Sequence, residues 1–212
     1  MLTQEQIQAN KEEFLELINS IEREGADIDR LINKLENSDF FSAPASTKYH
    51  AAYEGGLCQH SLNVYHNLVQ LCESKQNLDE QCYDENSLKI VGLLHDISKM
   101  NIYTFTPRNK KVYCEDGDKK DSLGTFKWVT ELEYALKENR FLYGSHEMNS
   151  EFIITNFIPL NIDESVAVLH HMGGMHYDSA KDNIGAVYTQ YSLSLMLHLA
   201  DMISTYVDER EI

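Results

Sequence analysis

Apolar side chains recur every three or four residues along most of the chain, which is the spacing of one face of an α-helix. These stripes predict helices over about residues 3–21, 28–35, 55–71, 85–98, 145–157, 163–172 and 187–207. Start signals support several of them, because Thr3 with Gln6 forms a capping-box pattern and Ser145 and Asp163 are suitable N-caps. The sequence therefore predicts an all-α fold built as a helical bundle.

One segment departs from the helical period. Residues 102–105 and 111–114 are rich in β-branched and aromatic side chains, and they flank the tetrapeptide of residues 107–110, which contains Pro107. This arrangement predicts a small β-hairpin insertion with an exposed turn, followed by a charged loop over residues 115–121. Since the hairpin follows Lys99 directly, we expect it to overhang any cleft formed there.

Two apolar stripes contain a polar residue where the period predicts an apolar one. His60 falls in the stripe of Leu57, Val64 and Leu68, and Asp201 lies among the apolar residues of the last helix. A buried and unpaired carboxylate is costly, so Asp201 must be paired, hydrogen-bonded or bound to a metal ion.

The dipeptide His95-Asp96, with Lys99 one turn later, ends a third apolar stripe. Imidazole and carboxylate groups together suit divalent Mn, Fe, Co, Ni or Zn. We expect His60, His95, Asp96 and Asp201 to surround one such ion. His146, His170 and His171 would supply a second sphere, with Asp96 bridging the two ions. Adjacent side chains on a helix diverge by about 100°, so one of His170 and His171 can ligate while the other contacts substrate or packs.

Composition and charge restrict the classes of molecule that the protein is expected to bind. The 212 residues carry a formal charge of -16, which is unfavourable for binding long nucleic acid but leaves room for a small phosphorylated substrate beside bound metal ions. No apolar run approaches the roughly 20 residues needed to cross a bilayer, and the N-terminus lacks a secretory signal. The four cysteines form no CxxC pair, which is typical of a reduced, cytoplasmic protein without a membrane partner.

The order H…HD…D, filled by His60, His95-Asp96 and Asp201, resembles the HD-domain superfamily of metal-dependent phosphohydrolases. Residues 55–61, with the sequence GGLCQHS, are similar to its GGLxxHS segment, and residues 96–99 resemble its D-x-G-K segment. The additional His146 and the pair His170-His171 resemble the subset with two-metal sites. The likeness covers roughly residues 49–208 and is nearest to HD domains of the kind attached to a bacterial 3′-to-5′ exoribonuclease.

The resemblance implies a helical fold, a site for one or two metal ions and hydrolysis of phosphoester bonds. It implies that His60, His95, Asp96 and Asp201 bind the first ion and that Asp96 also binds the second. His146, His170 and, as a further candidate, His171 match ligands of the second ion. Lys99 matches the lysine that contacts the substrate phosphate, so Asp96 and Lys99 are the expected catalytic residues.

The chain also departs from parts of that superfamily. Ser98 stands where a glycine is usual, and Gly56 stands where the HD-GYP branch has a glutamate four residues before the first histidine. The GYP signature is missing after His171, so hydrolysis of cyclic di-GMP is not expected. Residues 1–48 are predicted to be helical and leave no room for an OB-type nucleic-acid-binding module.

The sequence favours a phosphohydrolase acting on a small phosphorylated compound, with a nucleotide as the first candidate. A phosphodiesterase or exoribonuclease on short oligonucleotides is the alternative, and a non-catalytic metal-bound regulatory module is an alternative of another class. Arg108 and His176 are candidates for substrate binding, with a surface position as the competing interpretation; His50 is expected at the surface. We expect residues 1–40 to form an extension packed on the HD domain of residues 41–212, or to provide a homodimer contact.

Overall fold

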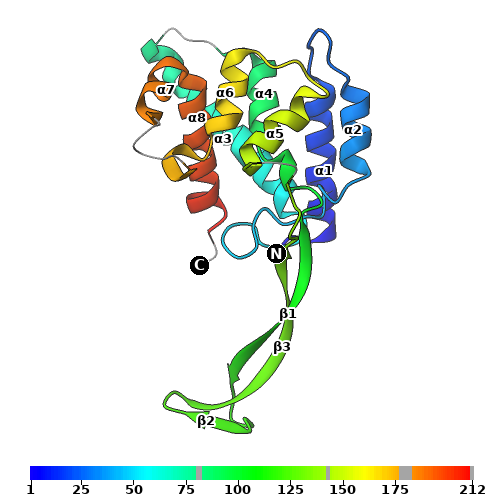
Figure 1. Cartoon of the computed structure of the whole chain (residues 1–212), viewed down its shortest axis with the longest axis vertical. Coiled ribbons are helices and arrows are strands. Elements are labelled where there is room, and N and C mark those ends of the chain that lie inside the picture. The colour runs from blue at the N-terminus through cyan, green and yellow to red at the C-terminus, as the bar shows by residue number, and fades with distance from the viewer. Residues whose placement is uncertain (80–82, 142–143, 177–182, 211–212) are drawn as a thin grey trace.

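A computed structural model describes residues 1–79, 83–141, 144–176 and 183–210, and for residues 75–79, 175 and 176 it describes the backbone alone. Within these residues most of the chain is helical, and the helices gather in one body from which a β-ribbon projects (Figure 1). The α-helices are α1 (Gln4–Asn19), α2 (Ile28–Glu36), α3 (Gly56–Asp79), α4 (Glu85–Leu94), α5 (His146–Thr155), α6 (Ile162–His170), α7 (Ile184–Gln190) and α8 (Ser192–Ile203). Three short helical turns, η1 (Ile97–Lys99), η2 (Gly173–His176) and the π-helical η3 (Ser204–Asp208), complete the helical part.

Local capping chemistry sets most helix starts. The capping box predicted at Thr3 is present, because its hydroxyl accepts from the Gln6 amide and the Gln6 side chain accepts from the Thr3 amide. The start predicted at Asp163 is wrong, since α6 is capped two residues earlier by Asn161, whose side chain accepts from the Glu164 amide at 2.9 Å. The helix predicted over residues 187–207 is divided into α7, α8 and η3, with the break at Tyr191.

Helices α1 and α2 are part of the main hydrophobic core. Phe14 and Ile18 of α1 and Leu31 and Leu35 of α2 are fully buried in the same cluster as the apolar faces of α3 and α4. Each such side chain contributes roughly 1.5–3 kcal/mol through the apolar surface that it removes from water. Helices α1 and α2 therefore share one hydrophobic core with α3 and α4.

Helices α3 and α4 approach each other closely at Gly92. A Cβ atom at this position would lie 2.9 Å from the Cα atom of Tyr65 on α3. That distance is shorter than carbon atoms tolerate, so only glycine permits this separation of the two helix backbones.

The β-segment is an antiparallel sheet of three strands, β1 (Tyr103–Tyr113), β2 (Lys119–Asp121) and β3 (Gly124–Leu136), in the order β1-β3-β2. The hairpin turn predicted at residues 107–110 is wrong, because β1 runs straight through Pro107 and pairs with β3, placing Pro107 opposite Leu132. Proline lacks an amide hydrogen, and β1 tolerates it because an edge strand is bonded on one side only. The charged loop predicted over residues 115–121 includes the short strand β2 at its end.

Among the described residues, none of the helices combines the length and the apolar character that crossing a membrane requires.

Candidate metal centre

Three elements far apart in sequence bring the first group of predicted ligands together. His60 lies on α3, His95 and Asp96 follow the end of α4, and Asp201 lies on α8. Nε2 of His60 is 3.3 Å from Oδ1 of Asp201 and 3.6 Å from Oδ2 of Asp96, and Nε2 of His95 is 3.5 Å from the same Asp96 oxygen. Two atoms that each lie about 2.0–2.2 Å from one ion are separated by about this much. His60, His95 and Asp96 therefore form a group with the dimensions of a coordination sphere, and Asp201 adjoins it through His60.

The second group forms around the other oxygen of Asp96. Nε2 of His146, at the start of α5, is 3.5 Å from Oδ1 of Asp96, and Nε2 of His171, just after α6, is 3.6 Å from it. The hydroxyl of Ser98 donates to the His146 carbonyl at 2.8 Å, which fastens α5 to the turn that follows Asp96. Asp96 therefore presents one oxygen to each group of histidines, as a bridging carboxylate would.

The far nitrogen of each imidazole is held by the protein. Nδ1 of His95 donates to the Gly92 carbonyl at 2.9 Å, and Nδ1 of His171 donates to the Val168 carbonyl at 2.7 Å. Nδ1 of His60 lies 3.0 Å from Glu209, and Nδ1 of His146 lies 3.3 Å from Glu147. A proton on Nδ1 leaves the lone pair on Nε2, so these contacts orient the rings for ligation.

The inner atoms have the chemistry of ligands rather than of a satisfied polar core. Nε2 of His60, His95 and His171 and Oδ1 of Asp96 are buried and have no hydrogen-bond partner within the part of the chain that the structure describes. Leaving several buried polar atoms in one place unsatisfied is costly unless something else binds them. A divalent cation at each group would satisfy these atoms, so the residues present fit the metal centre that the sequence predicts.

Electrostatics keeps the carboxylates charged. Burial alone would raise the pKa of Asp96, but Lys99, whose Nζ lies 2.6 Å from Oδ2, and the neighbouring imidazoles hold it well below its usual range. The pKa of Asp201 is likewise lowered, because contact with His60 outweighs burial. Burial lowers the pKa of His95, and it lowers that of His146 to about 3, so both rings are neutral at pH 7. Ionised carboxylates and neutral imidazoles are the forms that bind metals.

His60 differs from these two rings when no cation is present. Burial would lower its pKa, but the carboxylates of Glu209 and Asp201 on either side raise the pKa to about 10. In this state the buried imidazole carries the positive charge that its acidic neighbours attract. A metal ion at Nε2 would take over that role, since it supplies the positive charge at the same place.

The remaining predicted residues have different placements. His171, and not His170, joins Asp96 and His146 in a group with ligand dimensions, while His170 ends α6 outside the described groups. Arg108 lies on β1 with its guanidinium 3.3 Å from Glu133, and it lines neither of the two cavities beside the site. The side chain of His176 lies outside the described residues.

Sequence reasoning missed two residues of the centre. His50, expected at the surface, is half-buried with its ring centroid 4.8 Å from that of His60, and burial lowers its pKa to about 4. Glu209 follows the π-helical turn η3, which brings its buried carboxylate back to His60. The helical period of apolar residues gives no indication of Glu209. His50 lies close to the GGLCQHS segment in the sequence, and this proximity was a signal that it could lie near His60.

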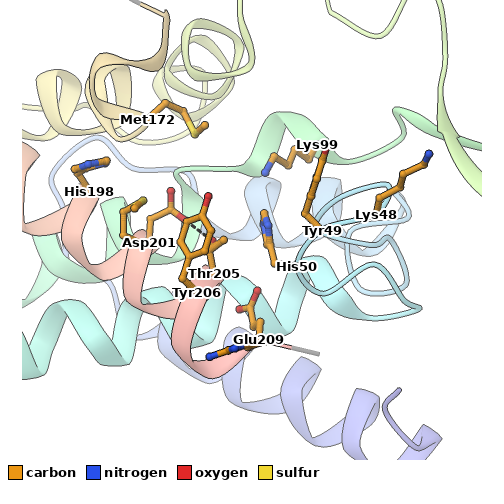
Figure 2. Close-up of a pocket in the computed structure, with 12 residues that line it drawn as sticks. Lys48, Tyr49, His50, Lys99, Met172, His198, Asp201, Thr205, Tyr206 and Glu209 are labelled. Atoms are coloured by element: carbon orange, nitrogen blue, oxygen red, sulfur yellow. Dashed lines mark hydrogen bonds between the residues drawn. The ribbon is translucent and has the colours of Figure 1, made fainter. Parts of the chain in front are cut away.

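A cavity of about 850 Å³ opens beside the centre, and Figure 2 shows its lining. Its lining includes His50, Lys99, Asp201 and Glu209, together with Lys48 and Tyr49. A second cavity of about 400 Å³ is lined by His146, Arg140 and the base of the ribbon, and it shares Tyr49 and Lys99 with the first. The overhang expected of the β-segment is thus limited to its base, because the rest of the ribbon points away from the helices (Figure 1).

Comparison of the chain with models of known protein families, with curated proteins and with solved structures gives no match. The geometry of the site is therefore the basis on which a function is proposed.

Proposed function

We propose that this protein is a metal-dependent phosphohydrolase of the HD type, which cleaves a phosphoester bond of a small phosphorylated compound, with a nucleotide as the first candidate. The observation that carries the proposal is the position of Asp96, whose two oxygens each lie 3.5–3.6 Å from imidazole nitrogens of a different group. A carboxylate shared by two imidazole-rich spheres suits a pair of transition-metal ions, and such pairs serve phosphoester hydrolysis.

Each residue of the centre has a role in this proposal. His60, His95 and Asp201 would hold one ion, His146 and His171 the other, and Asp96 both. Ions held by these residues would supply a water molecule of lowered pKa and positive charge for the phosphate oxygens.

Basic side chains at the cavity support a phosphorylated substrate. Lys48, Lys99 and Arg210 line the larger cavity, although the chain as a whole is strongly acidic. Cationic groups placed around a phosphate stabilise the charge that develops on it as the bond breaks. Lys99 is the nearest of them to the ligands, since its ammonium already pairs with Asp96.

The test combines metal content with turnover. The full chain is purified, loaded with Mn²⁺, Co²⁺ or Ni²⁺, and assayed against p-nitrophenyl phosphate, its bis-ester and a panel of nucleotides. We expect hydrolysis that falls about 1,000-fold in Asp96→Asn, which corresponds to about 4 kcal/mol of lost stabilisation. Asp163→Asn, at an exposed position in the first turn of α6, is the matched control and should keep the wild-type rate. Equal rates in the wild type and Asp96→Asn would reject the proposal.

A phosphodiesterase acting on short oligonucleotides is the second candidate, and the shape of the site favours it over a strict monoesterase. The two cavities share Tyr49 and Lys99, and one is lined by Asp201 and the other by His146, so each group of candidate ligands has a cavity beside it for one of the two groups that a phosphodiester joins. Release of mononucleotides from labelled RNA trimers, compared with release of inorganic phosphate from nucleotides, separates the two activities. Two bound metal ions without turnover of any of these substrates would instead favour a regulatory module.

A further inference from the structure

The two faces of the β-ribbon differ sharply in character. Because side chains alternate across a strand, every second residue of β1 and its partner on β3 share a face. One face is mostly apolar and aromatic. We call residues 103–136 the arm and this face the apolar face of the arm. Its members are Tyr103, Phe105, Pro107, Asn109, Lys111 and Tyr113 of β1, opposite Leu136, Tyr134, Leu132, Thr130, Trp128 and Phe126 of β3. The other face carries Arg108, Lys110, Glu131 and Glu133, which pair with one another.

The apolar face is open to solvent between the base of the ribbon and Phe126, which is 6% exposed at the far end. Tyr103 is buried and Tyr134 packs against the core, but Phe105 is 59% exposed, Trp128 48% and Leu132 69%. Figure 1 shows the ribbon extending away from all the helices, with β2 at its far end, so the helical body of the same chain does not cover this face. Two-stranded ribbons are marginal in water without a surface to pack on, and an apolar face of this kind marks an interaction site.

Charge identifies the kind of surface that fits. The arm contains six basic and six acidic side chains, so the formal charge of -16 belongs entirely to the rest of the chain. Contact between the bodies of two copies would bring two acidic surfaces together, whereas a neutral arm meets an acidic body without that repulsion. A polyanion is a poor fit, since Lys111, the basic residue of the apolar face, is paired with Asp121 at 2.9 Å.

The size of the arm favours a second copy of the chain over an unrelated partner. The nine pairs from Phe105 to Tyr113 lie beyond the base, and they span about 30 Å. Two strands are about 10 Å wide, so this part of the face covers roughly 300 Å². One arm lying on a partner would bury about 600 Å² in total, which is below the range of stable interfaces. Two arms exchanged across a two-fold axis would bury about 1,200 Å², the lower limit of the standard size, and only two identical chains can make this reciprocal contact.

We propose that the protein forms a homodimer by arm exchange, in which the apolar face of each arm lies on the helical body of the other copy. The alternative dimer, in which the β1 edge strands of two copies pair with each other, is disfavoured. In an antiparallel pairing centred on Asn109 it would place Arg108 opposite Lys110 of the second copy, and like charges directly opposite each other destabilise a sheet.

The oligomeric state of the full chain tests the proposal. Light scattering coupled to size exclusion should give the mass of two chains for the wild type and of one chain for Leu132→Glu on the apolar face. The matched control is Val112→Glu, which places the same carboxylate on the opposite face of the arm, beside Lys127, and should stay dimeric. A monomeric wild type, or a dimer that Leu132→Glu leaves intact, would overturn the proposal; circular dichroism confirms that each variant is folded.

A cross-linking experiment tests whether each arm lies on the helical body of the other copy. A photoreactive benzoylphenylalanine at position 132 should cross-link to peptides of the helical body of the second copy. Mixing this variant with isotope-labelled chain distinguishes cross-links between two copies from cross-links within one copy. Cross-links from position 132 to the arm of the second copy would show ribbon-to-ribbon contact and contradict arm exchange. These outcomes do not depend on the phosphohydrolase activity, since the exposed part of the arm contributes no metal ligand.

Discussion

Glu209 accepts a hydrogen bond from Nδ1 of His60 at 3.0 Å, although 149 residues separate the two along the chain. The same carboxylate accepts from the side-chain amide of Asn63, one turn further along α3. Both Glu209 and His60 are buried, so the contact fixes the plane of the imidazole with little competition from water. Glu209 thus orients the imidazole of a candidate ligand at one side of the centre.

The first prediction concerns this contact. Glu209→Gln should weaken binding of Zn²⁺ or Mn²⁺ about 10- to 100-fold, because a neutral amide orients His60 less firmly and lowers the basicity of Nε2. The fold should be retained, since glutamine has the same shape. Isothermal titration with the metal measures the effect, and Glu73→Gln at an exposed position of α3 is the control. Unchanged affinity in Glu209→Gln would show that this contact does not position His60.

The second prediction concerns the effect of metal ions on stability. A ligand that binds the folded chain at about 100 times its dissociation constant adds about 2.7 kcal/mol to the free energy of unfolding. We therefore expect Zn²⁺ or Mn²⁺ to raise the melting temperature of chelator-treated protein, and Ca²⁺ to raise it less because imidazole ligands suit transition metals. Thermal melts of the wild type and Asp96→Asn measure this. An equal gain from the same metal in Asp96→Asn would place the binding elsewhere.

The third prediction separates the two adjacent histidines after α6. His171→Gln should reduce the metal content by one ion per chain and the rate of hydrolysis about 100-fold, because Nε2 of His171 points at Oδ1 of Asp96. His170→Gln should keep the wild-type metal content, since His170 belongs to none of the described ligand groups. Elemental analysis of the two variants, prepared side by side, decides between them. The reverse result would mean that α6 ends in a different rotation from the one described.

The fourth prediction concerns stability away from the site. Arg23 holds the fully buried carboxylate of Glu164 with two hydrogen bonds, of 2.6 and 3.1 Å, and so ties the segment after α1 to α6. Arg23→Gln should cost about 3 kcal/mol, because it leaves a buried charge without its partner. Urea unfolding measures the loss, and Lys34→Gln on the surface of α2 should stay within about 0.5 kcal/mol of the wild type.

A second substitution tests the reason given for that loss. In the Arg23→Gln background, Glu164→Gln should recover part of the stability, because it removes the uncompensated charge while an amide can keep the contact with Ser87. No recovery would indicate that the loss comes from packing of the arginine side chain.

The sequence was sufficient where local chemistry decides the structure. The capping box at Thr3 and the helical period around His60 depend on neighbours within one or two turns, so both could be predicted. The choice between His170 and His171 could not, because it depends on how the end of α6 is rotated against the core. Glu209 was missed for a related reason, since a π-helical turn shifts the period just before it.

The error in the β-segment has a different origin. Pro107 favours a turn when the sequence is considered locally, but proline also fits an edge strand. The strand order that makes β1 an edge cannot be inferred from β1 alone. The alternation of apolar residues along β3, at Phe126, Trp128, Leu132, Tyr134 and Leu136, was the stronger indication of where β1 pairs. Register depends on such long-range pairing, which turn residues alone do not specify.

The geometry of the candidate metal centre depends on Gly92, which is not one of the proposed ligands. Its missing side chain allows α3 and α4 to approach at Tyr65, and its carbonyl orients His95, so one residue sets both the reach between His60 and His95 and the angle of one ring. Gly92→Ala should therefore lower stability by about 1–3 kcal/mol and weaken metal binding together. A saturation-mutagenesis screen for activity should find position 92 as intolerant of change as the ligands themselves, and tolerance of alanine there would show that the two helices can separate without loss. Mutational intolerance at this site would then reveal the spacing of two helices as well as the identity of the ligands.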